Sequence, residues 1–385
     1  MSRRRLVWAL GVSTAVLSLG AAIVVASALP FAYDFRAYWL AAQHLLAGAP
    51  VYEAPGAPLG QPDEFHYLPV VALPFLALAP LPLEVAARVW LAFQLALAVA
   101  LAVALIRPLE AGARPWAAAA YLFFLPTVLE VTLGNVDLFS VVLALLAWRW
   151  RTRPGASIVP YAAAVGTKFL ALILLPFYLA AGYGRIVVRA FALGTAVLVV
   201  TLPVLVSPTK EFLALLPRYL DTAWVREHAQ REDPAWLAVL IWSDLFPIVL
   251  ALAAIAAAIV FGRQARRDPQ HESDWHHLAL ALSPYLTPFG FVWTTFLIAA
   301  LPLFAITLRR ALRLEPAPRV AALAGLVACW SAMQLVQVHD IWPLVAHFVG
   351  VIGLVGIALA VLSLEARQTL GRSSPASRAT LSASG

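Results

Sequence analysis

Long apolar runs separated by short polar segments extend from residue 6 to residue 364. Most are close to the 20-residue length that an α-helix needs to cross the hydrocarbon core of a bilayer. Because a helix satisfies its own backbone hydrogen bonds in lipid, the pattern predicts an all-α, polytopic transmembrane bundle of about 12 helices. Single crossings are predicted at residues 6–29, 84–106, 115–131, 134–150, 187–206, 237–261, 319–338 and 343–364.

Two further apolar runs are predicted to be hairpins of short helices. Residues 156–181 have Lys168 near their middle, where an ammonium at the bilayer centre would cost about 3 kcal/mol. Residues 276–308 would form a helix about 50 Å long, against a core about 30 Å thick, and Pro284 interrupts them. A hairpin places both of its ends on one side of the membrane, with Lys168 at the tip near the outer face.

Composition and charge agree with a membrane protein. Hydrophobic residues make up 62% of the 385 residues and charged residues only 12%, whereas soluble domains are about 25% charged. The net charge of +7 comes from short basic clusters between apolar runs, which is the positive-inside pattern rather than a nucleic-acid-binding face. We therefore expect a multi-pass protein of the cell membrane, in contact with membrane lipids, with both termini cytoplasmic.

The two ends of the chain and one proline-rich segment complete the organisation. Residues 6–29 could be a signal peptide, but the apolar run exceeds the usual 7–15 residues, so we interpret it as the first membrane helix. Residues 69–81, which contain several prolines, are expected to be interfacial or re-entrant. Residues 1–365 are predicted to form one transmembrane domain, and the Ser-rich residues 366–385 a disordered cytoplasmic tail.

This topology gathers the unusual polar residues at helix ends on one face, the outer one. A transporter would place such residues near the midplane along a path. Their clustering at the face suits a reaction at the outer boundary between lipid and water. The group comprises Asp34, His44, Tyr52, His66, Tyr67, Glu130, Asn135, Asp137, Lys168, Arg218, Asp221, His228, His339 and Asp340.

Asp34 is the candidate catalytic residue. It directly precedes residues 35–47, an amphipathic stretch that would lie along the membrane surface and hold the carboxylate at the headgroup level. There it could take a proton from a sugar hydroxyl that attacks an activated sugar. The alternative is that Asp34 is only the N-cap of the helix. The apolar side of this stretch carries Phe35, Trp39, Ala42 and Leu46.

The other candidates each have a functional and a structural interpretation. Lys168 could offset the negative charge on a departing phosphate, or it could snorkel to the headgroups. Arg218 could assist it, although most of the loop 207–236 is expected to be solvated surface. Asn135 and Asp137 could contact substrate or simply terminate helices.

Two aromatic and histidine pairs add to the list. His66 and Tyr67 could form a wall of the substrate site or part of an interfacial aromatic belt. His339 and Asp340 could orient a substrate hydroxyl or form only a loop.

Motifs of several soluble enzymes are absent from the sequence. There is no Walker loop, dinucleotide-binding glycine fingerprint or His-Glu-x-x-His, and the single cysteine offers no thiolate site. No Asp-x-Asp pair is present to bind a nucleotide sugar through a metal, which favours a lipid-phosphate donor. We expect no metal and no cofactor.

An ordered set of short motifs resembles glycosyltransferase family 87, over most of residues 1–300. The similar segments are Asp34 followed by Tyr38-Trp39, then His66-Tyr67-Leu-Pro69, Leu133-Gly-Asn135, Gly166-Thr-Lys168 and Ala281-Leu-Ser-Pro-Tyr285.

The resemblance implies a C-type glycosyltransferase architecture with an amphipathic helix in the first outer loop and an extracytoplasmic active site. It implies a polyprenyl-phosphate sugar donor, often mannose, a lipid or glycan acceptor, and an inverting displacement. Asp34 matches the catalytic base of the family and Lys168 its hairpin lysine. One departure, Leu286-Thr-Pro-Phe289 in place of the family's Trp and His, concerns the acceptor side. The candidate substrate-binding residues are Lys168, Tyr38, His66, Tyr67, Asn135, Arg218, His339 and Asp340.

Three alternatives remain at the level of sequence. A transporter or lipid flippase would move its substrate without covalent chemistry and line a transmembrane path with polar groups. Another C-type enzyme, such as an oligosaccharide ligase or protein glycosyltransferase, would differ in its donor. A structural membrane subunit would need no clustered outer carboxylates.

Overall fold

The computed structural model describes residues 31–52, 64–112, 114–168, 172–219, 245–267, 271–282, 294–334 and 346–373, with a few isolated positions before them. Every regular element in these ranges is helical, as the sequence predicted. In chain order the elements are α2 (Tyr33–Ala47), the 3-10 helix η1 (Pro69–Ala77), α3 (Leu83–Ile106), α4 (Arg114–Leu122), α5 (Leu125–Leu133), α6 (Asp137–Arg149), α7 (Pro154–Thr167), α8 (Leu174–Ala180), α9 (Gly184–Tyr219), α12 (Leu245–Arg267), α13 (His271–Leu282), η4 (Thr294–Ala299), α14 (Ala300–Ala311), α15 (Pro316–Gln334), the π-helical turn η5 (Ala346–Ile352) and α17 (Gly353–Ser373).

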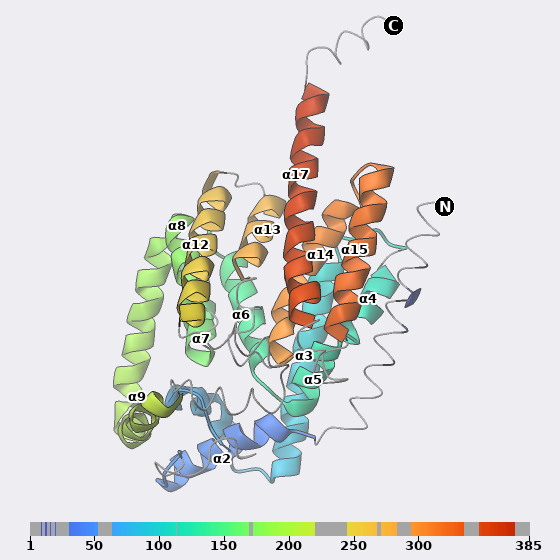
Figure 1. The fold of residues 1–385 in the computed structure, drawn as a ribbon. Helices are drawn as coiled ribbons and strands as arrows, with labels where there is room; N and C mark the ends of the chain where they lie inside the picture. Colours follow the sequence, from blue (N-terminus) through green and yellow to red (C-terminus); the bar gives the residue numbers. More distant parts are fainter. Residues whose placement is uncertain are drawn as a thin grey trace, which may run out of the picture.

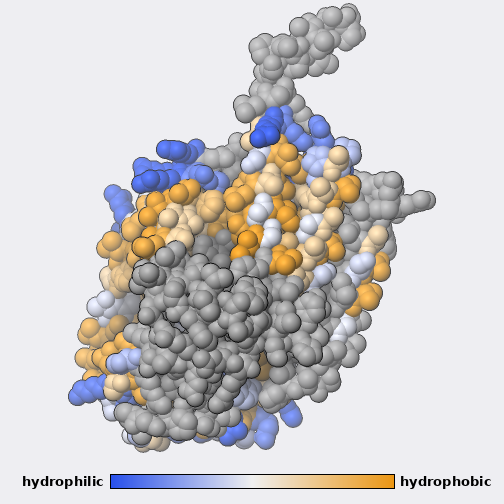
Figure 2. Space-filling view, viewed as in Figure 1, coloured by the Kyte–Doolittle hydropathy of each residue, from blue (hydrophilic) through white to orange (hydrophobic). Residues whose placement is uncertain are grey.

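The helices form a bundle with two different ends. Figure 1 shows α2 lying across one end, whereas α8 and the C-terminal half of α17 lie at the other. On the face drawn in Figure 2, hydrophobic side chains make up most of the coloured surface between the two ends, and hydrophilic ones gather at the ends. This distribution is what a bilayer requires of a protein that it surrounds. We call the first end the α2 end and the second the α8 end.

Three of the described helices are long and apolar enough to cross a membrane, namely Leu83–Ile106, Gly184–Pro217 and Val349–Gln368. Helices α5 and α6, whose axes meet at 113°, add a fourth if the pair counts as one broken span. These helices support a membrane protein. The count of about 12 crossings stays a prediction, and the first predicted helix, 6–29, lies almost wholly outside the described residues.

The predicted single helix at residues 115–131 is wrong. The chain forms two helices there, α4 and α5, with a break at Phe123 and Phe124. Pro126 is at the start of α5, where a missing N–H costs nothing, whereas in an unbroken helix its ring would clash with the carbonyl of Leu122, the last residue of α4. The amide of Leu125 instead donates to the side-chain oxygen of Gln334 at 2.7 Å, so α15 caps the start of α5.

The run at residues 156–181 is divided at Lys168, whose extended backbone follows α7. Helix α8 then leads back toward the end from which α7 started, because the rings of Trp148 and Tyr183, which flank the pair, lie 5.6 Å apart. The pair is therefore a hairpin, with Lys168 remote from its ends. The run at 276–308 is likewise divided, into α13 and α14, which pack together; the tip predicted at 283–288 lies outside the described residues.

Among the predicted boundaries that differ from the structure, two concern segments that were predicted not to be membrane helices. Helix α9 is 36 residues long and continues beyond residue 206 through Pro208 and Pro217, so the start of the predicted outer loop 207–236 is helical. Helix α17 continues past residue 365 to Ser373, and Glu365 forms an ion pair with Arg310 of α14 at 2.6 Å. A long helix can continue through a proline with a bend, and Figure 1 shows α9 changing direction near its C-terminal end.

Helix α2 confirms the helix predicted at residues 35–47 but not the whole of its apolar face. Phe35, Tyr38 and Ala42 are buried, whereas Leu46 is 59% exposed. Trp39 is half-buried and its indole N–H donates to the carbonyl of Leu81 at 3.2 Å. On the face that turns inward, the hydroxyl of Tyr38 has a buried partner, Asn135.

Candidate functional site

A sharp turn between α5 and α6 forms the floor of the candidate site. Gly134 ends α5 with a left-handed backbone (φ 75°), which a glycine adopts without strain. A Cβ on Gly134 would lie only 2.7 Å from the Cβ of Phe35, so the missing side chain lets the turn contact α2. The amide of Ala32 also donates to the carbonyl of Thr132 at 2.8 Å. The start of α2 is thereby fixed directly over Asn135.

Asn135 connects the polar side chains of this turn. Its side-chain Nδ2 donates to Oδ2 of Asp34 at 2.8 Å. Its Oδ1 accepts from the hydroxyls of Tyr38 at 3.3 Å and Tyr67 at 3.4 Å, and from the amide of Val136 at 2.6 Å. These donors fix which end of the amide faces Asp34. Asn135, predicted to bind substrate, is therefore engaged by protein groups on both of its side-chain atoms.

Asp34 lies in the first turn of α2 and does not cap it. The N-cap is Ala32, without a side-chain hydrogen bond, so the N-cap interpretation of Asp34 is wrong. Burial is the largest influence on its carboxyl group and raises the pKa from 3.8 to about 6. The hydrogen bond from Asn135 opposes this shift, Asp137 adds to it, and Lys168 opposes it. Asp34 thus titrates in the range in which a general base works at neutral pH.

Lys168 and Asp137 form a buried ion pair beside Asp34. The lysine Nζ contacts Oδ1 of Asp137, with side-chain exposures of 12% and 0%. The ammonium also lies 5.9 Å from the centre of the Tyr67 ring. Asp137 was predicted to terminate a helix or contact substrate, and it does begin α6, but its carboxylate is also the partner of Lys168. The structure therefore brings Asp34 and Lys168 into one cluster, at the α2 end of the bundle.

Two further buried residues support the turn: Glu130, which the sequence placed in the outer polar group without a role of its own, and Gln94, which it did not single out. Oε1 of Glu130 accepts from the amide of Leu138 at 2.7 Å and so caps the start of α6. Gln94, in the apolar helix α3, donates its side-chain amide to the carbonyl of Asn135. A lone glutamine within an apolar span was the available signal, because a buried amide needs a polar partner.

Aromatic rings cover the cluster on the side of η1. The Tyr38 ring lies 5.2 Å from that of Tyr67 and stacks on Phe75 at 4.9 Å. Phe65 approaches both tyrosines, at 6.2 and 5.8 Å. Tyr67 is half-buried, so one side of this aromatic group borders the polar cluster.

The other candidates lie apart from this cluster or outside the described residues. His66 is exposed and pairs with Glu64 at 3.6 Å. Arg218 lies in the last turn of α9, and its side chain is outside the described part. His339 and Asp340 fall in a segment that is also outside it.

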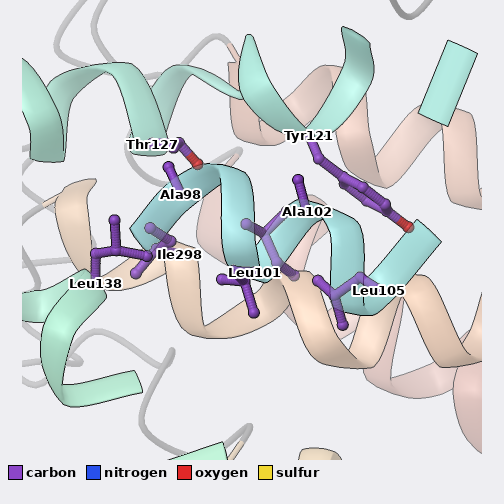
Figure 3. Close-up of a pocket in the computed structure, with 9 residues that line it drawn as sticks. Ala98, Leu101, Ala102, Leu105, Tyr121, Thr127, Leu138 and Ile298 are labelled. Atoms are coloured by element: carbon purple, nitrogen blue, oxygen red, sulfur yellow. The ribbon is translucent and has the colours of Figure 1, made fainter. Parts of the chain in front are cut away.

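A separate small cavity lies between α3, α4, α5, α6 and η4 (Figure 3). Apolar side chains form most of its wall, including Leu101, Leu138 and Ile298, and hydroxyls come from Tyr121 and Thr127. Neither a carboxylate nor a basic side chain lines it among the described residues. This cavity therefore lacks the groups that the chemistry of the Asp34 cluster requires.

Residues 65–284, more than half of the chain, match the sequence profile of glycosyltransferase family 87. The matched segment includes Tyr67, Asn135, Asp137 and Lys168 but begins after Asp34. No curated protein and no solved structure matches the chain.

Proposed function

This chain belongs to glycosyltransferase family 87, and from that premise we propose that it transfers a sugar from a polyprenyl-phosphate donor to an acceptor hydroxyl at the outer face of the cell membrane. The proposed sugar is mannose, the acceptor a lipid or glycan, and the architecture that of the C-type glycosyltransferases. The observation that carries the proposal is Asp34, a half-buried carboxylate with a pKa of about 6, oriented by Asn135 beside the Lys168–Asp137 pair.

In the proposed reaction the acceptor oxygen attacks the anomeric carbon while Asp34 takes the hydroxyl proton. The bond between that carbon and the phosphate oxygen breaks, and the polyprenyl phosphate leaves with the electron pair. Attack opposite the leaving group inverts the anomeric configuration. A carboxylate that is partly shielded from water, and therefore more basic than a free aspartate, suits the proton transfer.

Lys168 is proposed to act on the leaving group. Asp137 holds its ammonium in place, and a charge fixed in advance stabilises a developing negative charge without reorganisation. Because Asp137 neutralises part of this charge, a second cation would help, and Arg218 on the outer end of α9 is our candidate. Tyr38, Tyr67 and the aromatic group around them would border the bound sugar, and His66, His339 and Asp340 remain proposed contacts for the acceptor side.

The topology of the proposal follows from the charge pattern. Arg266 and Arg267 end α12, and the side chain of Arg266 lies beside Gly182, which follows α8. By the positive-inside rule this end faces the cytoplasm, which places the α2 end and Asp34 outside. We also propose a multi-pass protein with both chain termini in the cytoplasm, because Arg3, Arg4 and Arg5 precede the first predicted membrane helix and basic residues follow the last one.

The donor class is the direct test of this function. Purified protein in liposomes is incubated with radiolabelled polyprenyl-phosphate mannose or with a nucleotide-linked mannose, and lipid and glycan products are separated. We expect product from the polyprenyl donor alone. Product from the nucleotide sugar alone would refute the donor assignment, and movement of the lipid across the bilayer without product would favour a flippase.

Transfer should also depend on the ionisation of Asp34. Only the carboxylate accepts a proton, so kcat/KM should fall as the pH is lowered through about 6. The hydrogen bond from Asn135 lowers this pKa, so Asn135→Ala should move the acid limb to higher pH. A pH profile of the wild type and this variant provides the check; a flat profile from about pH 8 to pH 5 would exclude Asp34 as the base.

A further inference from the structure

Glu211, near the outer end of α9, makes a long-range contact that the proposed reaction does not use. Its Oε2 accepts the amides of Val51 at 2.9 Å and Tyr52 at 3.2 Å, and its Oε1 accepts the hydroxyl of Ser207 at 3.0 Å. Charge-assisted hydrogen bonds of this kind are stronger than those between neutral groups. One carboxylate thus joins α9 to the short segment that follows α2, about 160 residues away in the chain.

Tyr52 carries this contact toward the candidate site. Its hydroxyl donates to the backbone carbonyl of Tyr67 at 2.5 Å. Its ring lies 5.7 Å from those of both Phe65 and Phe212, and the residue is only 6% exposed. Tyr52 is therefore held at its backbone by Glu211 and at its hydroxyl by the segment that carries Tyr67.

Tyr67 completes the connection. Its hydroxyl donates to Asn135, which donates to Asp34, and its ring faces the ammonium of Lys168. A shift of the Tyr67 backbone would displace its hydroxyl and ring together. Because misplacement of about 1 Å can reduce a catalytic rate a hundredfold, this backbone position matters for the geometry of the site.

We propose that Glu211 is a positioning residue. It fixes residues 51–52 to α9, a contact that we call the latch. Through Tyr52, the latch holds the side chains of Tyr67 and Asn135 in position relative to Asp34 and Lys168. The inference rests on the proposed function for its effect on rate, but not for its effect on structure. Much of α9 is exposed at the surface of the bundle, since only 11% of its apolar 18-residue stretch is buried. The contacts at Glu211 are thus a specific tie between this peripheral helix and the site.

Kinetics test the latch with variants that remove it in steps. Glu211→Ala should lower kcat about tenfold with little change in the KM for the donor, and Glu211→Gln, which keeps one acceptor oxygen, should lower it less. Adding Tyr52→Phe to Glu211→Ala should lower kcat only a little further, because both substitutions act through the same contact. Lys210→Gln, on the exposed neighbouring residue, is the matched control and should leave kcat unchanged.

Hydrogen–deuterium exchange of the full chain in lipid nanodiscs separates this inference from the proposed function. In Glu211→Ala, exchange should rise at residues 51–52 and also at 65–68, while Lys210→Gln matches the wild type. Unchanged exchange at 65–68 together with unchanged kcat would overturn the latch. A wild type that transfers no sugar from polyprenyl phosphates would refute the proposed function, and the exchange result would still decide the latch.

Discussion

Asp34→Asn should lower the rate of sugar transfer about 10²- to 10⁴-fold, the usual contribution of a general base. An asparagine at this position keeps the size of the side chain and an oxygen that can accept from Nδ2 of Asn135. It cannot take a proton from the acceptor. Single-turnover rates with saturating donor report this step without interference from product release.

The same variant should not be less stable than the wild type. The folded protein raises the pKa of Asp34 from 3.8 to about 6, so the folded state binds this proton more tightly than the unfolded state. The contribution of Asp34 to stability is thus present below about pH 3.8 and is lost as the pH rises through about 6. At pH 7 the ionised carboxylate destabilises the folded state, and asparagine removes this effect. A large fall in the unfolding temperature would indicate that any loss of activity reflects misfolding rather than chemistry.

Lys168→Met should have the second large effect, on stability as well as on transfer. It leaves Asp137, which is fully buried, without its cation. Breaking a buried ion pair from one side typically costs about 3–5 kcal/mol, more than removing both charges. We therefore expect a marked drop in the thermal unfolding temperature and loss of transfer. Lys210→Met, on the exposed face of α9, is the control and should change neither quantity.

The double variant Lys168→Met with Asp137→Asn separates the two roles of the lysine. Removing both charges should restore most of the unfolding temperature, because neither member of the pair is then left buried without its partner. Transfer should stay low if the ammonium stabilises the departing phosphate. Recovery of both stability and transfer would show that Lys168 serves only the fold.

Elements bounded by strong local signals were predicted closely. The helix predicted at residues 84–106 is α3, Leu83–Ile106, because Pro82 precedes it and the apolar run has no internal breaker. The break at Lys168 was also predicted, since a charge in the middle of an apolar run is costly. The break between α4 and α5 was missed because the apolar pattern continues across it; Pro126 and a distant partner, Gln334, decide it.

The sequence predicted which residues form the candidate site better than it predicted the contacts between them. That Asp34, Asn135 and Lys168 share one cluster follows from placing helix ends on one face. The hydrogen-bond and ion-pair partners of these residues could not be predicted. Asp137 reaches Lys168 only through the packing of α6 against α7. Asn135 orients Asp34 only because Gly134 lets α2 approach the turn. Such contacts depend on how helices pack, which periodicity and charge do not specify.

The most direct test uses sealed liposomes that contain wild-type protein or the Asp34→Asn variant, with labelled polyprenyl-phosphate mannose and acceptor supplied only on the side that exposes the α2 end. The account predicts labelled product with an inverted anomeric centre from the wild type and almost none from the folded variant. Equal product from both proteins, or product only when donor is supplied at the α8 end, would contradict it.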